Sequence, residues 1–543
     1  LLKLSKNPTL FQPDFLPLAR PLLPGTRAMA RFKPYDYAQG LIVPVNLDEQ
    51  IEPGTFVFAL HHLIEARYDD SFLAEEFKND DTGRPAYPPK LLLKAILFAY
   101  SQGILSSRKI ERACKHNIRF MALLCGEGPD HSTIAAFIHK LGKHVEQVFV
   151  DVLTVCHEEG LLDGTHFAVD GLKLPTDAAK EWSGTFDTLK RKRDKFRKKA
   201  AALMKEHKRR DRRLAKGKTE VAGETLTPAE KLIAKAAKID AFLSENEPRA
   251  GVSGKEVQSN LTDPGSSKMH TSKGTVQGYN CQALADGSHQ IVTCAHIPDG
   301  GQDGRVLGEL FEQASARAEA AGLGGDFYRG KELLADANYH SEPNLEACAA
   351  HRLDAVIPDP NHRDRDERYE GRDQHLRKVR PKDTGRFTAA DFTRDEEAGT
   401  YRCPKGQVLR RKPGTSTSAG GKGAFHKYEI ESDFCSICEF RSRCLGKNGK
   451  RRTLSVCIEP ARPHCKAMRE KVDTPVGRHR YSYRMGTIEP IFANLRHAKG
   501  LNRINYRGRE KVGVIWNLWS IMHNIGKIAL YRPGYGTGVP ATG

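Results

Sequence analysis

The stretch Thr165-His-Phe-Ala-Val-Asp-Gly171 decides the fold of this chain of 543 residues. Its short apolar run predicts a β-strand that ends on the carboxylate of Asp170. A second run of the same kind, Glu332-Leu-Leu-Ala335, leads directly into Asp336. We therefore expect two carboxylates at the carboxyl edge of one sheet.

The segments around these two strands supply the other elements of an α/β domain. Residues 276–285 and 290–297 flank Asp286-Gly287, a turn signal that predicts a hairpin. Strand, hairpin, helix, strand, helix, strand, helix is the element order of an RNase H-like α/β domain. The remaining expected elements are helices over residues 305–321 and 343–350, a strand over 354–357, and helices over 487–496 and 510–528.

The region ahead of the first strand is predicted to be all-helical. Pro88-Pro89 opens one helix, residues 108–124 form a second, and Asp130 or Ser132 caps a third. Short helices joined by tight turns resemble a helix-turn-helix module, with a plain helical bundle as the alternative. The cations that such a module would display include Arg108, Lys109, Arg112 and Arg119.

These elements divide the chain into a helical DNA-binding domain over residues 29–160 and a catalytic domain over 161–530. Residues 1–28 are rich in Leu and Pro up to Met29. We interpret them as a disordered leader or as read-through from a misplaced start codon. Residues 531–543 are expected to form a disordered tail. Two long insertions interrupt the catalytic domain.

The first insertion, residues 175–270, is strongly basic. Residues 181–240 contain 19 Lys or Arg against 9 Asp or Glu, so over half of the formal net charge of +19 lies there. An apolar stripe from Phe196 to Leu203 predicts one helix, and the capping box Thr227-Pro-Ala-Glu opens another. We expect a basic helical hairpin that contacts phosphates, with a merely solvated charged face as the alternative.

The second insertion, residues 359–480, is long enough to require a small fold of its own. Cys-x2-Cys is a common half-site for structural zinc, and four thiolates suit a tetrahedral site. The gap of 31 residues before the second cysteine weakens the pattern, so unrelated surface thiols are the alternative to Zn²⁺. The four cysteines concerned are Cys403, Cys435, Cys438 and Cys444.

The overall charge and composition limit the classes of function. With 86 Lys or Arg against 67 Asp or Glu, the chain favours a polyanionic partner, chiefly nucleic acid. The most apolar stretch, residues 512–525, contains polar residues and is too short for a membrane span. Twelve cysteines without a secretory signal indicate a reducing compartment, so we expect a cytoplasmic, nucleoid-associated protein.

A third carboxylate completes the expected catalytic site. Glu489 lies beside the apolar stripe of an expected helix and can face the edge where Asp170 and Asp336 converge. Mg²⁺ or Mn²⁺ prefers such oxygen ligands, and two ions can activate a nucleophile and stabilise a leaving 3′ oxygen. A single aspartate at a strand end is more often a cap or turn residue. Three carboxylates in this order favour a metal site.

Five short stretches of the sequence form an ordered set of motifs. They are Tyr87-Pro-Pro-Lys-Leu-Leu-Leu93, Phe167-Ala-Val-Asp-Gly171, Gly278-Tyr-Asn-Cys-Gln282, Leu334-Ala-Asp-Ala-Asn-Tyr339, and Arg484 through Glu489 to Phe492. Together they resemble the bacterial insertion-sequence transposases of the DDE type. The resemblance implies an N-terminal helical domain and an RNase H-like catalytic domain that binds two Mg²⁺ (or Mn²⁺) ions through Asp170, Asp336 and Glu489.

The resemblance also implies accessory roles around Glu489. Relatives of this type place a Tyr and an Arg before the catalytic Glu and a Lys after it. Tyr481 and Arg484 occupy the upstream places, with one residue more than the commoner spacing between Arg484 and Glu489. Arg496 stands where the Lys is expected and can bind a DNA phosphate through its guanidinium.

The sequence therefore predicts a transposase that binds the terminal inverted repeats of its own element. It would cleave double-stranded DNA, transfer the freed 3′ ends to a target, and act as a homo-oligomer when two ends are synapsed. One alternative is an RNase H-like endonuclease that cuts without joining. The other is a non-catalytic or decayed transposase-derived DNA-binding protein, whose expected mark would be a lost carboxylate.

Overall fold

The computed structural model describes residues 44–71, 85–214, 228–251, 255–271, 274–371, 387–414, 416–417, 424–431, 433–446, 449–458 and 462–537. The expected leader, residues 1–28 with Met29, lies outside the described residues, as do Thr227 of the predicted capping box and the end of the tail.

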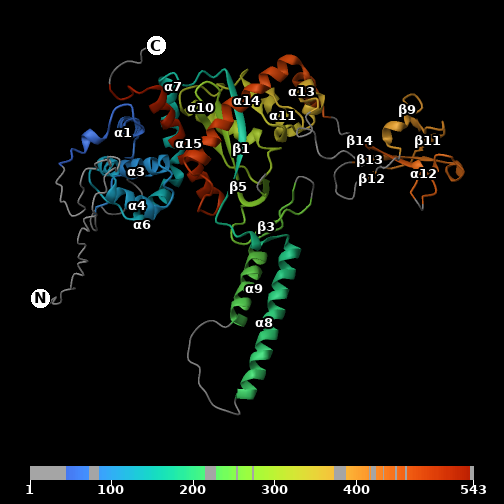
Figure 1. Ribbon diagram of the computed structural model, residues 1–543, viewed down its shortest axis with the longest axis horizontal. Coiled ribbons are helices and arrows are strands. Elements are labelled where there is room, and N and C mark those ends of the chain that lie inside the picture. The colour runs from blue at the N-terminus through green and yellow to red at the C-terminus, as the bar shows by residue number, and fades with distance from the viewer. Residues whose placement is uncertain are drawn as a thin grey trace, which may run out of the picture. The chain divides into compact units, whose positions relative to one another are not determined.

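A mixed six-stranded sheet carries the two aspartates (Figure 1). β5 is antiparallel to β1, whereas β7 and β8 run parallel to it. The order β4-β5-β1-β7-β8, with β6 also on β5, is consistent with an RNase H-like sheet and makes β1 and β7 neighbours. The strands are β1 (His166–Pro175), β4 (Ser267–Thr271), β5 (Gly274–Asp286), β6 (Val292–His296), β7 (Glu332–Ala335) and β8 (Asp354–Val356).

The prediction that β1 ends on Asp170 is wrong. β1 continues for five residues to Pro175, and this extension pairs with β5, where Pro175 lies opposite Gly278. The pairing with β7 is shorter and ends at Val169–Ala335. Asp170 thus marks the end of the parallel ladder and not the end of the strand.

Helices cover both faces of this sheet. The face of Ala168 and Leu172 shares a core with α14 and α15, and the face of Phe167 and Val169 packs against α10 and α11. Among the described residues no helix has the length and apolarity that a bilayer span requires. These helices are α10 (Leu307–Ala320), α11 (Glu342–Ala350), α13 (Pro463–Asp473), α14 (Pro475–Ala493), which continues as a π-helix (Asn494–Ala498), and α15 (Arg509–Tyr531).

The N-terminal region is helical, as predicted, but its second helix is divided. Asn117 is extended (φ −112°, ψ 120°) and its side chain accepts a hydrogen bond from the backbone N–H of Arg119, so residues 108–124 form two helices. Asp130 caps the next helix, as expected, by accepting from two backbone N–H groups. The helices are α1 (Phe56–Arg67), α3 (Pro89–Ser101), α4 (Ser107–His116), α5 (Ile118–Leu123), α6 (His131–Lys140) and α7 (Val145–Glu158).

α15 joins this helical region to the sheet. It packs against α1, α3, α7 and β6, so one hydrophobic core runs from Val57 to Ile528. Trp519 stacks on Tyr100 with ring centroids 5.1 Å apart. Arg532, in the expected tail, donates a hydrogen bond to the backbone oxygen of Glu159 (2.8 Å), so the expectation of disorder from residue 531 onward is wrong for this residue.

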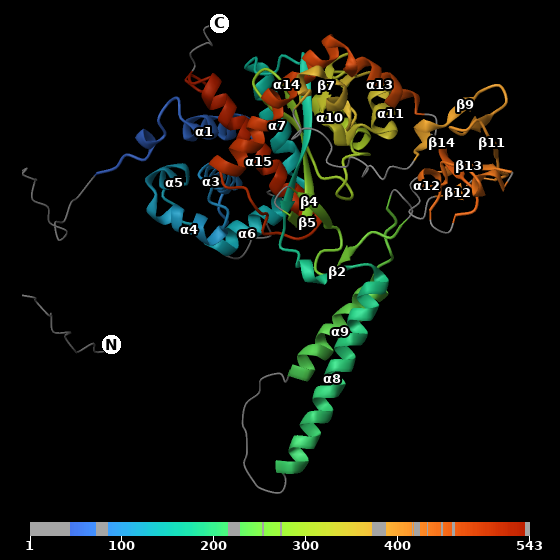
Figure 2. The same ribbon diagram turned by 45° about the vertical axis from the view of Figure 1, so that its right-hand side comes forward.

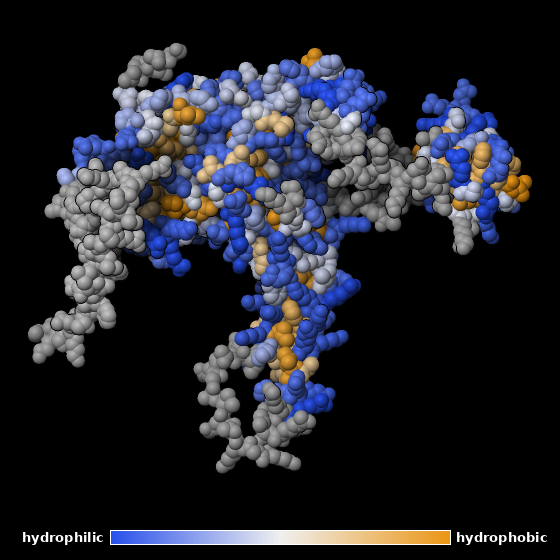
Figure 3. Space-filling model, viewed as in Figure 1, coloured by the Kyte–Doolittle hydropathy of each residue, from blue (hydrophilic) through white to orange (hydrophobic). Residues whose placement is uncertain are grey.

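The first insertion forms the predicted basic helical hairpin. α8 (Phe186–Leu214) and α9 (Pro228–Glu245) lie side by side in both views (Figure 1, Figure 2). Phe186, Leu189, Ile239 and Phe242 form their common core. Hydrophobic residues remain visible between the charged ones on the hairpin surface (Figure 3). Leu203 and Ile233 belong to the hairpin and are exposed over 38% and 44% of their surface.

The second insertion forms a separate small sheet with its own core, as expected. It ends earlier than predicted, because residues 463–480 already belong to α13 and α14, and Lys471 of α13 donates to the backbone oxygen of Ala355 in β8 (2.6 Å). Its strands, in the order β12-β13-β11-β10-β9 with β14 on β13, are β9 (Thr393–Asp395), β10 (Thr400–Arg402), β11 (Val408–Arg411), β12 (Ser416–Thr417), β13 (Ala424–Ile430) and β14 (Thr453–Ile458); α12 (Arg441–Cys444) follows β13.

Shorter elements complete the described chain. β2 (Ser183–Gly184) pairs with β3 (Ser259–Asn260) at the base of the hairpin. Single 3-10 turns lie at Asp48–Gln50, Leu141–Lys143, Lys180–Trp182, Ala337–Tyr339, His362–Arg365, Glu367–Tyr369, Ala389–Asp391 and Asp433–Ser436.

Candidate active site

Asp170, within β1, and Asp336, directly after β7, lie at the same level of these neighbouring parallel strands. Each directly follows one member of the last β1–β7 pair, Val169 and Ala335. Asp336 also caps the turn that follows it, since its carboxylate accepts from the backbone N–H (2.8 Å) and the side-chain amide (2.9 Å) of Asn338. The structure thus brings together the two aspartates that the sequence pattern singled out.

Arg484 connects Asp170 with Glu489. On α14, its guanidinium donates through Nη1 to Oδ2 of Asp170 (3.0 Å) and through Nη2 to Oε1 of Glu489 (3.1 Å). The Arg484 side chain is 11% exposed, against 22% for Asp170 and 45% for Glu489. A buried fork of this kind can hold two carboxylates that would otherwise repel each other.

Burial dominates the acidity of both aspartates. It raises the pKa of Asp170 to about 6, although the cation of Arg484 opposes this shift, and the charge of Asp336 adds to it. Burial also raises the pKa of Asp336 above its ordinary value. Each carboxyl group therefore resists ionisation unless more positive charge arrives.

The donor set fits a hard divalent cation. Asp170, Asp336 and Glu489 offer oxygen ligands only, which Mg²⁺ and Mn²⁺ prefer. In the part of the chain that the structure describes, these three carboxylates do not all come within 4.8 Å of one another. Arg484 lies between two of them.

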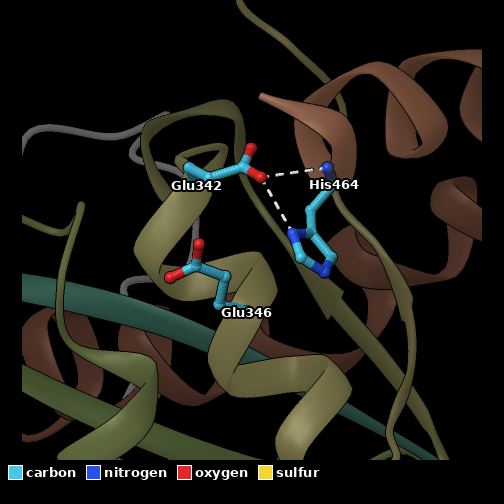
Figure 4. A group of neighbouring side chains, drawn as sticks. All are labelled: Glu342, Glu346 and His464. Carbon is cyan, nitrogen blue, oxygen red and sulfur yellow. Dashed lines mark hydrogen bonds and ion pairs between the residues drawn. The ribbon is translucent and has the colours of Figure 1, made fainter. Parts of the chain in front are cut away.

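Glu342, Glu346 and His464 do reach this spacing (Figure 4). Glu342, however, accepts from the backbone N–H groups of His464 and Cys465, both at 3.0 Å, and lies 2.8 Å from Nδ1 of His464. It therefore caps the first turn of α13. These contacts give Glu342 and His464 a structural role without a cation.

The two other predicted accessory residues lie along the same helical segment. Tyr481 is half-buried next to Arg484, and its ring meets that of His362 edge-on at 5.6 Å. Arg496 lies in the π-helical turn after α14, and its buried Nε has no hydrogen-bond partner within the described chain. Neither residue makes a described hydrogen bond or ion pair with Asp170, Asp336 or Glu489.

The predicted N-terminal cations are exposed on α4 and α5. Arg119 pairs with Glu52 at 3.3 Å. Arg108, Lys109 and Arg112 make no ion pair with any described residue. They leave three positive charges on one short helix.

The four predicted zinc ligands gather in the small sheet. Cys435 is buried in its core, with Cys403 and Cys444 packed against that core. Burial raises the pKa of Cys444, and the other three thiols raise it further. Within the described residues, no three of these sulfurs lie within 4.8 Å of one another, and all four thiols are free.

Sequence patterns missed a buried polar network beside Asp170. Asp303 accepts hydrogen bonds from the side-chain amides of Asn280 (2.6 Å) and Gln282 (3.0 Å), and Gln282 in turn accepts one from the hydroxyl of Tyr339. Three residues of this network, Asn280, Gln282 and Tyr339, belong to the motifs on which the family resemblance rests. Asp303 lies in a glycine-rich loop that gave no signal.

Two regions of the chain match models of known families. Residues 45–140 match the Transposase domain (DUF772), and residues 402–529 match the Transposase DDE domain. The second match contains Glu489 and all four cysteines, whereas Asp170 and Asp336 lie outside both. Neither a curated protein nor a solved structure matches the chain.

Proposed function

Because this chain is an insertion-sequence transposase of the DDE type, with an N-terminal transposase domain and a DDE domain, we propose that it cuts its element's ends and joins them to target DNA. One observation carries this proposal. Asp170 in β1 and Asp336 after β7 lie at the same level of adjacent parallel strands, and Arg484 pairs with both Asp170 and Glu489. No Ser, Tyr or His nucleophile is needed for this chemistry.

In this proposal Asp170, Asp336 and Glu489 hold Mg²⁺ or Mn²⁺. When bound, two such ions supply Lewis-acid activation of the attacking oxygen and stabilisation of the leaving 3′ oxygen. Arg484 keeps Asp170 and Glu489 near each other by partly neutralising both. We also propose that two further residues contact the DNA backbone. Tyr481 precedes Arg484 on α14, and Arg496 lies in the π-helical turn that continues this helix.

Two basic surfaces are proposed to bind the double-stranded element ends. One is the exposed side of α4 with Arg108, Lys109 and Arg112. The other is a face of α8. Arg193 and Arg197 are bound by Asp240 of α9 and hold the hairpin together. No ion pair with a described residue holds Lys195, Lys198 or Lys199, so these lysines remain available for phosphates.

We further propose that the four cysteines hold a structural Zn²⁺. Their common location supports this, because Cys403, Cys435 and Cys444 meet at one small core and the neighbouring thiols raise the pKa of Cys444. Purified protein is expected to carry about one zinc per chain, since four thiolates fill a tetrahedral site. Cys435→Ser should abolish that zinc and destabilise the small sheet, whereas Cys125→Ser, at an exposed cysteine elsewhere, should retain it.

The terminal inverted repeats are the proposed binding sites, and synapsis of two ends requires a homo-oligomer. We expect the protein to act in the cytoplasm on the nucleoid. The match to transposase domains and the two basic surfaces support these expectations.

The decisive experiment incubates the full chain with labelled element-end DNA, a target plasmid and Mg²⁺ or Mn²⁺. Joined products that disappear in Asp336→Ala are the expected result. Cleavage without joining would replace the proposal with an endonuclease. Tight end binding without metal-dependent chemistry would favour a non-catalytic derivative.

A further inference from the structure

A layer of buried polar side chains lies against β1 on the face opposite to Asp170. Side chains alternate along a strand, so Gly171 faces away from Asp170 and towards the core of Val169. Gln282 lies opposite Gly171 and Asn280 lies opposite Lys173 in the β1–β5 register. Both amide side chains therefore lie against the strand that carries Asp170, on the face opposite to the aspartate.

Gly171 makes this close approach possible. A Cβ atom at this position would come within 2.5 Å of both Asn280 Oδ1 and Gln282 Nε2. Any larger residue next to Asp170 would push these amides away. The backbone of the aspartate-bearing strand thus rests directly on the two side chains.

Asp303 fixes the orientation of both amide side chains by hydrogen bonding. Its Oδ1 atom accepts from Asn280 (2.6 Å) and Gln282 (3.0 Å), and Asp303 is 9% exposed while both amides are fully buried. Within the described chain this is the one hydrogen bond of the Asn280 side chain, because its Oδ1 is buried without a partner. Without Asp303, Asn280 would lose its only fixed orientation.

The same network reaches the turn that follows Asp336. Tyr339, three residues on and fully buried, donates its hydroxyl to Gln282. Asn344 donates to the backbone oxygens of both Asp303 (2.8 Å) and Tyr339 (3.0 Å). One carboxylate therefore anchors the strand of Asp170 and the turn of Asp336 together.

We propose that Asp303 is a positioning residue for the cation site, acting through Asn280, Gln282 and Tyr339 on Asp170 and Asp336. The inference rests on the proposed function in that it concerns the cations these aspartates would hold. Groups that orient metal ligands from behind typically account for about 10- to 100-fold in metal affinity or activity. The acceptor oxygen of Asp303 is the feature that the amides require.

The test measures Mn²⁺ binding by the full chain with electron paramagnetic resonance. Binding that is lost in Asp336→Ala defines the site. Asp303→Ala should weaken this binding by about 10- to 100-fold. Asp303→Asn keeps an oxygen acceptor for both amides and should stay within about 3-fold of the wild type. Tyr339→Phe keeps the buried ring, tests the same link if Asp303→Ala does not fold, and should weaken binding about 10-fold.

Asp263→Ala is the matched control. Asp263 is also a buried carboxylate (2% exposed) and accepts the hydroxyl of Tyr279 (2.7 Å), but it makes no described contact with this network. Its loss should leave Mn²⁺ binding unchanged.

The outcomes separate this inference from the proposed function. Unchanged Mn²⁺ binding in folded Asp303→Ala would overturn the inference, as would equal losses in Asp303→Asn and Asp303→Ala. Weakened binding in Asp303→Ala, together with no DNA cleavage by the wild type, would support the inference and overturn the function. Absence of any Asp336-dependent Mn²⁺ binding by the wild type would overturn both.

Discussion

Arg484 is the residue on which the electrostatics of the candidate site depends. Its guanidinium is the one cation paired with Asp170 among the described residues, and it also pairs with Glu489. Even so, burial keeps the pKa of Asp170 near 6. The site is therefore short of positive charge, which is the condition under which a divalent cation gains most by binding.

Replacing Arg484 by Ala should destabilise the protein without metal and much less with Mg²⁺. Removing one partner of a buried ion pair costs about 3 kcal/mol because the remaining carboxylate is left unpaired. Thermal unfolding in EDTA and in Mg²⁺ measures both states. Arg503→Ala removes an exposed pair with Asp177 and should change little. An equal loss of stability with and without Mg²⁺ would contradict this account.

Asp170→Asn should stabilise the metal-free protein at neutral pH. The folded pKa of Asp170, about 6, lies above its ordinary value of 3.8, so its favourable contribution is complete below pH 4 and is lost as the pH rises through 6. The uncharged variant should match the wild type at pH 3.5. It should exceed the wild type by up to about 3 kcal/mol at pH 8.

Urea unfolding in EDTA across this pH range provides the measurement. The difference in stability between Asp170→Asn and the wild type should grow between pH 4 and 6 and then level off. A difference that stays constant with pH would mean that Asp170 ionises as in the unfolded chain.

At the scale of elements, α8 separates its cations into two sets. Arg193 and Arg197 face α9 and are bound by Asp240, whereas Lys195, Lys198 and Lys199 lie on an exposed face without ion pairs to described residues. Lys198 and Lys199 lie three and four positions after Lys195, so a single helix face presents all three lysines. The hairpin thus uses some charges for its own stability and leaves others for a partner.

The variant Lys195→Gln/Lys198→Gln/Lys199→Gln should weaken end-DNA binding and reduce its salt dependence. Each lost phosphate contact lowers the slope of log K against log salt by about 0.9, so the slope should fall by about 3. Fluorescence anisotropy over a salt series gives this slope. Arg193→Gln/Arg197→Gln should instead loosen the hairpin and leave the slope nearly intact. Equal slopes in the triple variant and the wild type would exclude this face from DNA binding.

At the scale of the whole molecule, α15 makes the helical region and the sheet one folding unit. Trp516 donates its indole N–H to the backbone oxygen of Gln282 (2.7 Å), and Asn524 bonds both backbone groups of Val292 at 2.8 Å. Arg317, buried on α10, donates to Glu146 of α7 and Asn517 of α15. The expected domain boundary near residue 160 therefore separates the helical region from the first strand, but one hydrophobic core extends across it.

Trp519→Ala should lower the stability of the N-terminal helices and of the sheet together. Its ring is fully buried and stacks on Tyr100, and truncating such a residue costs about 3 to 5 kcal/mol. Calorimetry should show one transition for both regions shifting to lower temperature. Tyr531→Ala, at the exposed end of the same helix, is the control. Loss of the N-terminal transition alone would show two independent domains.

Local patterns were sufficient for the short elements. β7 begins and ends where its apolar run does, and Asp130 caps α6 as its sequence indicates. They were insufficient where a distant partner sets the boundary. β1 continues beyond Asp170 because β5 supplies a longer ladder, and α13 begins before residue 480 because it packs on β8.

The sequence by itself determined the mixed α/β architecture, the neighbouring aspartates and the basic hairpin, because periodicity, turn residues and charge density act over a few residues. Only the tertiary structure decided that Arg484 bridges Asp170 to Glu489 across 314 residues, that Asp303 supports both aspartates, and that α15 unites the cores. Such contacts depend on how helices pack against the sheet, and no local pattern encodes the distance between side chains so far apart in the chain.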